Sequence, residues 1–253
     1  MDKFPRRKNG SNDTELTREG RISSQRPLQF STQSTRTSAR ADWGAYIVGI
    51  RAKWSGVNPE TLGPDPLTVF EGWFAEAHAL DPRWADAMTL ATASPDGRPS
   101  ARTVLYKGVA EGALYFVSNY GSRKGQDLEQ NPRAALVFFW ASLNRQVRIE
   151  GSVARAPAAW SDRYFAGRAR SSQIGAWASA QSAVIASRDA LEARIAEAEA
   201  RFRDQPVPRP PFWGGYLLEP ERIEFWLGQN ARLHDRFSYQ RGPSGWSVER
   251  LSP

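Results

Sequence analysis

Cysteine is absent from this chain of 253 residues. Its absence excludes disulfide bridges, thiolate metal sites and cysteine nucleophiles, and it is compatible with the reducing cytoplasm. Histidine is nearly absent as well, since His78 and His234 are the only two. A histidine-rich metal centre is therefore excluded, and we expect no metal ion in the functional site.

Long apolar segments are also missing. The longest uninterrupted apolar run, residues 134–141, is far too short to span a bilayer. The N-terminus lacks the apolar core that a secretory signal peptide contains. The sequence therefore predicts a cytoplasmic protein with no membrane partner.

Three common catalytic signatures are missing too. The chain has no glycine-rich phosphate loop, no Gly-x-Ser-x-Gly nucleophile motif and no paired-carboxylate signature. Any chemistry must therefore depend on a different arrangement of side chains.

The net charge of +7 is concentrated near the N-terminus. Residues 1–40 contain nine Lys/Arg and four Asp/Glu, so five of the seven positive charges lie there. The segment is rich in Ser, Thr, Arg and Gln and poor in large apolar residues, which predicts a disordered basic tail. Such a tail can bind polyanions weakly, and an organelle transit peptide is an alternative that the four acids disfavour. We expect no nucleic-acid partner.

The folded domain is predicted to span residues 65–253, after an N-terminal extension over residues 41–64. Asp65 followed by Pro66 is typical of a helix start, and apolar residues follow at helical spacing. A β-rich region comes next. We expect its strands at 87–92, 100–107, 114–118, 134–140 and 146–154, with a polar helix at 122–130.

The remaining chain mixes helices and strands. We expect helices at 158–168 and 187–203, a proline-rich connector at 206–211, short strands at 215–218 and 223–226, and a hairpin around 242–245. Short turns between strands, with helices inserted among them, are typical of an antiparallel β-barrel decorated by helices. The predicted class is therefore α+β, mainly β.

Cationic and hydroxyl side chains are frequent on or beside the predicted strands. Arginine forks, a lysine point charge and serine hydroxyls are good ligands for phosphate monoesters. Two such clusters in one barrel would suit two phosphorylated ligands, although most Lys and Arg residues of any protein are solvated surface. The candidates are Arg102, Lys107, Ser122, Arg123, Lys124, Arg148, Arg168, Ser171 and Ser172.

A second cluster lies near the C-terminus. Trp226 ends an apolar strand, and His234 follows between Arg232 and Arg236. This pattern fits a binding site, and it fits equally a surface hairpin with an exposed histidine.

Several segments, taken in order, resemble the pyridoxine/pyridoxamine 5′-phosphate oxidase family from about Pro64 to Pro253. Each segment is weak alone, but their order and spacing make a strong signature. The matching segments lie at 102–107, 118–119, 121–124, 131–133, 145–151, 172–177, 181–182, 212–215, 222–226 and 232–236.

The resemblance implies a Greek-key split β-barrel that binds FMN and works as a homodimer, with the flavin at the subunit interface. In that interpretation Arg102, Arg123, Lys124 and Ser182 contact the FMN phosphate. Ser118, Gln146, Gln181, Trp226 and Arg236 contact the isoalloxazine and ribityl parts. The remaining cofactor-contacting positions that it implies are Thr103, Val104, Leu105, Tyr106, Lys107 and Val117.

The resemblance also implies a substrate and a reaction. The substrate phosphate would be held by Lys107, Tyr164, Arg168 and Ser172, and the catalytic pair Arg232 and His234 would lie against the substrate pyridine ring. The reaction would oxidise pyridoxamine or pyridoxine 5′-phosphate to pyridoxal 5′-phosphate while O2 becomes H2O2. Two alternatives stay open, namely a related flavin oxidase of the phenazine type and a non-catalytic carrier of FMN or pyridoxal phosphate.

The sequence departs from the family pattern at a few positions. In the extension, the family usually has an Arg-x-x-Tyr pair that meets the substrate, and this chain has Arg51 and Trp54 there. Val117 replaces a common aromatic residue, and Tyr106 stands where an aliphatic residue is usual. Residues 227–231 replace a stretch that usually begins with Gln. These changes bear on the substrate more than on FMN.

Overall fold

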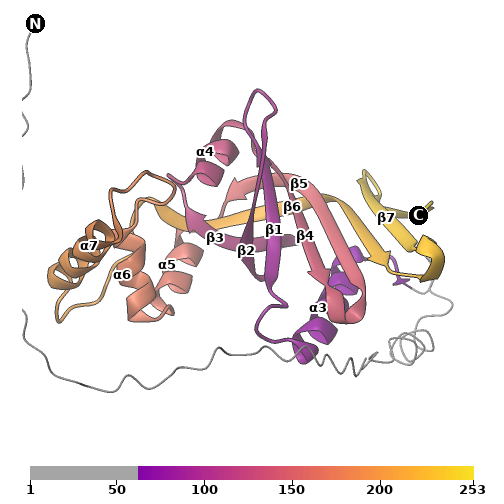
Figure 1. Ribbon diagram of the computed structural model, residues 1–253. Coiled ribbons are helices and arrows are strands. Elements are labelled where there is room, and N and C mark those ends of the chain that lie inside the picture. Colours follow the sequence, from indigo (N-terminus) through magenta and orange to yellow (C-terminus); the bar gives the residue numbers. More distant parts are fainter. Residues whose placement is uncertain (1–61) are drawn as a thin grey trace, which may run out of the picture. The chain divides into compact units, whose positions relative to one another are not determined.

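The computed structural model describes residues 62–253 (Figure 1). The predicted basic tail, most of the N-terminal extension, Arg51 and Trp54 lie outside the described residues.

Six antiparallel strands form a closed barrel. They hydrogen-bond in the order β3-β2-β1-β4-β5-β6, and β3 also pairs with β6, which closes the sheet. The order of β4, β1, β2 and β3 is that of a Greek key, so the predicted split-barrel class is confirmed. The strands are β1 (Ala87–Ala93), β2 (Pro99–Ala110), β3 (Ala113–Asn119), β4 (Arg133–Trp140), β5 (Arg145–Arg155) and β6 (Trp213–Leu227).

Two further strands extend the sheet beyond β6. β7 (Asp235–Gly242) pairs with the second half of β6, and β8 (Gly245–Leu251) pairs with β7. Figure 1 shows β7 on the opposite side of the barrel from the helices α5 to α7. The C-terminal strands therefore lie far from those helices within one chain.

Five α-helices accompany the strands in the described part of the chain. They are α3 (Pro66–Leu80), α4 (Arg123–Gln130), α5 (Ala158–Ala166), α6 (Arg170–Ala178) and α7 (Arg188–Arg201). Short 3-10 turns occur at η1 (Ala141–Leu143) and η2 (Asn230–Arg232). Among residues 62–253, no helix combines the length and the apolar character that crossing a membrane requires.

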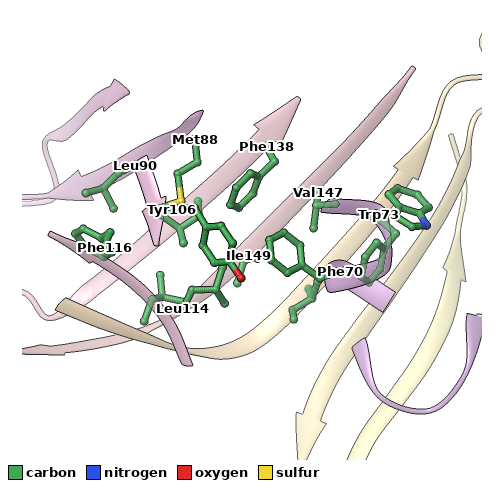
Figure 2. Packing of buried hydrophobic residues seen from close by; sticks show 14 of the residues in the cluster. Phe70, Trp73, Met88, Leu90, Tyr106, Leu114, Phe116, Phe138, Val147 and Ile149 are labelled. Carbon is green, nitrogen blue, oxygen red and sulfur yellow. The ribbon is translucent and has the colours of Figure 1, made fainter. Parts of the chain in front are cut away.

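The start of α3 follows directly from its sequence. The carboxylate of Asp65 accepts hydrogen bonds from the N–H groups of Leu67 at 3.1 Å and Thr68 at 3.2 Å, while Pro66 occupies the first helical position. The helix then packs its apolar face on the barrel core (Figure 2). Phe70 lies 5.0 Å from Phe138 between ring centroids. This apolar contact anchors the described N-terminal end to the barrel.

β6 corrects one expectation from the sequence. Two short strands were predicted at 215–218 and 223–226, but the structure has one strand of fifteen residues. Pro220, which suggested a break, is accommodated because the pairing with β5 shifts register between Glu150 and Gly151. At this bulge a proline without an N–H is tolerated.

α6 was not predicted. Ser171, Ser172 and Gly175 have low helix propensity, and the helix has no side-chain cap at its N-terminus. It is held instead by burial of Ile174 and Ala178 in a second apolar cluster with α5 and α7. Tertiary packing therefore forms this helix where the local sequence gives no signal.

β2 and β3 separate at one end of the barrel. Their pairing begins at Tyr106 opposite Phe116 and continues toward the turn that joins them. Residues 99–105 of β2 pair with β1 alone. This split leaves one edge of β2 open beside the end of β3.

Candidate functional site

A pocket of about 970 Å³ lies in the split between β2 and β3. Its wall is completed by α5, by α6 and by the segment after α6. It brings together fourteen of the residues that the sequence predicted as cofactor or substrate ligands. These are Arg102, Thr103, Val104, Leu105, Lys107, Val117, Ser118, Arg123, Lys124, Tyr164, Arg168, Ser172, Gln181 and Ser182.

Arg102 is held in place from beneath the pocket. Its guanidinium donates to the hydroxyls of Thr92 and Ser100, both at 2.7 Å. Thr92 in turn donates to the carboxylate of Asp127 at 2.6 Å, which also lies 3.9 Å from Arg102. Burial lowers the pKa of Arg102, while Asp127 opposes that change. The arginine is thus fixed and desolvated before any ligand binds.

Lys124 adds a second cation at the same end. Its ammonium donates to Gln181 at 2.9 Å and to Ser122 at 3.1 Å. Ser122 also caps α4, because its hydroxyl accepts from the N–H of Gly125 at 3.3 Å. Burial, with the positive charge of Arg102, lowers the pKa of Lys124 to about 8. An anion bound here would relieve both effects and would meet the positive end of the α4 dipole.

Arg168 lines the same pocket from the connection between α5 and α6. Its Nη1 atom is buried and has no hydrogen-bond partner among the described residues, and its guanidinium lies 4.7 Å from the ring of Trp213. Burial lowers the pKa of this arginine. Lys107, in the same pocket, is paired with Asp86 at 2.9 Å. A buried donor without a partner is costly, so Arg168 is suited to binding a second anionic group.

Gln146, Trp226 and Arg236 lie on the outer face of β5, β6 and β7, and Arg232 and His234 lie in the connection between β6 and β7. The register places Gln146, Trp226 and Arg236 side by side in one row across the three strands. The ring of His234 lies 4.6 Å from that of Trp226, and its Nδ1 atom accepts from the N–H of Gln229 at 3.1 Å. We call this set the β5–β7 cluster, and it comprises Gln146, Trp226, Arg232, His234 and Arg236.

One chain does not bring the pocket and the β5–β7 cluster together. Trp213 lines the pocket at the start of β6, and Trp226 belongs to the β5–β7 cluster near the end of the same strand. Thirteen residues at about 3.3 Å each separate them by roughly 40 Å along the strand. Figure 1 shows α5 to α7 and β7 on opposite sides of the barrel.

Two predicted site residues have an unusual backbone. Ser182, in the pocket, has φ of +73°, and Arg232 has φ of +62° directly after Ala231 at +55°. The left-handed region is unfavourable for residues with a Cβ atom, and such conformations cluster at functional sites. The backbone geometry therefore singles out one position in the pocket and one in the β5–β7 cluster.

Tyr106 is placed differently from its neighbours. Its side chain is buried in the core, 5.4 Å from Phe70 and 5.0 Å from Phe74 between ring centroids. Tyr106 does not line the pocket, and its main-chain N–H donates to the carbonyl oxygen of Asp86 at 2.8 Å. The tyrosine therefore belongs to the packing between α3 and the barrel.

Sequence reasoning missed three acidic residues beside the site. Asp86 pairs with Lys107, Asp127 lies beneath Arg102, and Glu224 bonds to Arg236. Only Glu224 could have been found from the sequence, because strand alternation puts residues 224 and 226 on the same face of β6. The pairing of the other two depends on contacts across the fold.

Two family models match this chain. The model described as pyridoxamine 5′-phosphate oxidase matches residues 77–202, and the model described as the C-terminal dimerisation region of pyridoxine 5′-phosphate oxidase matches residues 213–253. Together they cover more than half of the sequence. The chain belongs to the pyridoxine/pyridoxamine 5′-phosphate oxidase family. It is an oxidoreductase and a flavoprotein of the split-barrel fold.

Relatives in this family are similar over most of their length. The pyridoxine/pyridoxamine 5′-phosphate oxidase of Rubrobacter xylanophilus is 53% identical over 209 residues, which cover 82% of this chain and 96% of that protein. The protein of the same name from Burkholderia cenocepacia is 56% identical over 193 residues, which cover 75% of this chain and 90% of that protein.

Solved structures share the fold. PhzG from Burkholderia lata, in complex with tetrahydrophenazine-1-carboxylic acid, superposes with a TM-score of 0.73 at 32% identity and covers 78% of this chain and 98% of its own. An FMN-binding protein from Nostoc punctiforme, described as related to pyridoxamine 5′-phosphate oxidase, gives a TM-score of 0.60 at 20% identity. It covers 78% of this chain and 100% of its own.

Proposed function

We propose that this oxidoreductase uses FMN to oxidise pyridoxamine and pyridoxine 5′-phosphates to pyridoxal 5′-phosphate. The amine substrate, O2 and water would give the aldehyde, ammonia and H2O2. The alcohol substrate and O2 would give the aldehyde and H2O2. The observation that carries this proposal is a pocket lined by two sets of cations with different partners, since cofactor and substrate each bring one phosphate.

FMN fits the part of the pocket formed by Arg102, Arg123 and Lys124. Two desolvated cations and a helix N-terminus suit a phosphate dianion. The open edge of β2 in the split would accept the flavin ring, beside Ser118 and Gln181. When bound, FMN supplies the two-electron redox chemistry that the side chains lack.

The substrate phosphate is assigned to the other set of cations. Arg168 has a buried donor to offer, and Lys107 supplies a second charge while Tyr164 and Ser172 line the same wall. Releasing Lys107 from Asp86 toward a phosphate replaces one charge pair by another. These four residues would hold the substrate in place and so orient its reacting carbon.

Arg232 and His234 are proposed to hold the pyridine ring of the substrate. Because Nδ1 of His234 accepts a hydrogen bond from Gln229, Nε2 carries the proton of the neutral ring and is free to donate. Arg232 would stabilise negative charge that develops during the oxidation. Arg51 and Trp54, in the N-terminal extension, remain predicted substrate contacts.

We also propose that a second copy of the chain completes the site. The β5–β7 cluster is too far along β6 to reach the pocket of its own chain, and all of its residues except Gln146 lie in the segment that matches the family's dimerisation region. Leu105 in the pocket wall and Phe139, which pairs with Gln146 across β4 and β5, are 44% and 60% exposed. Burying such apolar side chains between two copies favours a homodimer, which we place in the cytoplasm.

The test is a reaction with the purified protein. We expect a yellow protein, or a colourless one that becomes yellow with FMN, to convert pyridoxamine 5′-phosphate in air. Pyridoxal 5′-phosphate and H2O2 should form in equal amounts. A protein that stays inactive and binds no FMN contradicts the proposal.

A phenazine-type flavin oxidase is the second candidate, because PhzG shares the fold at 32% identity. The four residues assigned to the substrate phosphate count against it, since a substrate without a phosphate gives them no role. A non-catalytic carrier is the third candidate. Turnover of a tetrahydrophenazine carboxylate would favour the second candidate, and FMN binding without turnover of either substrate would favour the carrier.

A further inference from the structure

Glu224 is a buried carboxylate beside the β5–β7 cluster. Its side chain is 8% exposed, and it lies on the central strand β6 between two arginines. One oxygen accepts from Nε of Arg236 at 2.8 Å, and the other accepts from a guanidinium nitrogen of Arg148 at 3.3 Å. The carboxylate therefore joins β5, β6 and β7 on the outer face of the sheet.

These bonds fix the orientation of Arg236. A second nitrogen, Nη1, donates to the main-chain oxygen of Ser252 at 2.9 Å. Its remaining nitrogen, Nη2, makes no hydrogen bond among the described residues, so it is the one left for a ligand. The bond to Glu224 also raises the pKa of Arg236. The arginine is thus kept charged and held at two of its three nitrogens.

We propose that Glu224 is a positioning residue that orients Arg236 toward the flavin bound by a second copy of the chain. The proposal rests on the proposed function, which assigns Arg236 to the flavin. A free arginine side chain must lose rotamer freedom on binding, and Glu224 has already removed that freedom. Trp226, two residues after Glu224 on the same face of β6, pairs with Arg236 in the register and so lies on the same side of the sheet.

The test compares FMN dissociation constants of the full-length protein. Glu224→Gln offers one acceptor to two guanidinium groups, so we expect FMN to bind about tenfold more weakly. Glu150→Gln is the matched control, because Glu150 bonds Arg148 on the same face at 2.9 Å and does not touch Arg236. We expect the control to stay within about twofold of the unmodified protein.

A double-mutant cycle separates positioning from a general effect on the fold. In an Arg236→Met background, Glu224→Gln should change the FMN dissociation constant by no more than about twofold. At saturating FMN, Glu224→Gln and Arg236→Met should also give the same altered visible circular dichroism of the flavin. If Glu224→Gln prevents folding, Glu224→Asp keeps the charge but falls short of Arg236, and the same weakening is expected.

Two results would overturn the inference. One is unchanged FMN affinity in Glu224→Gln. The other is that Glu224→Gln weakens FMN binding equally in the unmodified protein and in the Arg236→Met variant. Both leave the proposed function intact if the unmodified protein binds FMN and turns over. Failure of the unmodified protein to bind FMN would overturn the proposed function and this inference together.

Discussion

At the scale of single residues, the pocket separates two kinds of cation by their surroundings. Arg102 is supported from below by Thr92 and Asp127, whereas Arg168 has a buried donor with no partner among residues 62–253. The first arrangement suits a permanently bound cofactor, because the site is rigid before binding. The second suits a ligand that arrives and leaves, because the buried donor is satisfied only in the complex.

Changing Arg168 to alanine tests this division. Loss of a charged hydrogen bond costs about 1.5–3 kcal/mol, so KM for pyridoxamine 5′-phosphate should rise about tenfold or more. The FMN dissociation constant should stay within about twofold. Arg163→Ala, an exposed arginine of α5, is the control for steady-state kinetics and flavin titration. Equal losses in both constants would show that the two sets of cations are assigned wrongly.

From the lowered pKa of Lys124 we predict that FMN binding depends on pH. Its pKa of about 8, lowered by burial and by Arg102, means that the empty pocket loses this charge as pH rises through 8. A bound phosphate favours the protonated form, so binding takes up a proton above that pH. FMN affinity should therefore be level below about pH 7.5 and fall by up to about tenfold per pH unit above 8.

Fluorescence titrations across this pH range measure the effect. Riboflavin, which has no phosphate, should show a much shallower dependence, and Lys124→Met should flatten the curve for FMN. An unchanged slope in Lys124→Met would assign the proton to another group.

Sequence reasoning identified the basic residues of the pocket but not their acidic supports. Arginine, lysine and serine near strand ends indicate phosphate chemistry by their type alone. Asp127 and Asp86 give no such signal, because each acts only through a partner 21 or more residues away. The alternation of Glu224 with Trp226 is the exception, since two-residue spacing defines a shared strand face.

At the scale of elements, the bulge between β5 and β6 explains why a proline did not end β6. The carbonyl oxygen of Glu219 approaches so closely that a Cβ atom at Gly151 would collide with it. Glycine at position 151 therefore permits the shift in register that accommodates Pro220. From sequence alone, Pro220 favours a strand end, and only the pairing across the sheet shows a continuous strand.

Replacing Gly151 by alanine should destabilise the protein through this contact. Forcing a methyl group against backbone costs about 1–3 kcal/mol of unfolding free energy. Gly72→Ala is the matched control, because nothing lies within 4 Å of a Cβ atom there and the position is inside α3. Alanine at 72 should stabilise the protein by about 0.5–1 kcal/mol. Denaturant unfolding measures both, and equal effects of the two changes would contradict this account of the bulge.

The helices differ in how well the local sequence predicts them. α3 and α4 begin at Asp65 and Ser122, whose side chains bond to the first turn, and both starts were predicted. α6 has no capping side chain and owes its helical form to burial against α7. Local signals find the first kind of helix, whereas the second needs the tertiary structure.

At the scale of the whole molecule, the proposed site consists of two parts that one chain keeps apart. The residues of both parts can be recognised in the sequence. Their distance from each other cannot, because residue order does not show whether contacts lie within a chain or between chains. The continuous strand β6 supplies that information, since it carries Trp213 at one end and Trp226 near the other. In the proposed function, a dimer is then required for activity.

Mixed dimers test this central claim most directly. One variant carries Lys107→Ala with Arg168→Ala, and the other carries Arg232→Ala with Arg236→Ala. Each should be nearly inactive at low substrate concentration.

Co-expression in equal amounts makes about half of the dimers mixed, and each mixed dimer contains one intact site. Activity should therefore recover to about a quarter of that of the unmodified protein. Recovery at this level, measured as pyridoxal 5′-phosphate formed per dimer, is the result that we predict. No recovery from demonstrated mixed dimers would contradict a site shared between two copies of the chain.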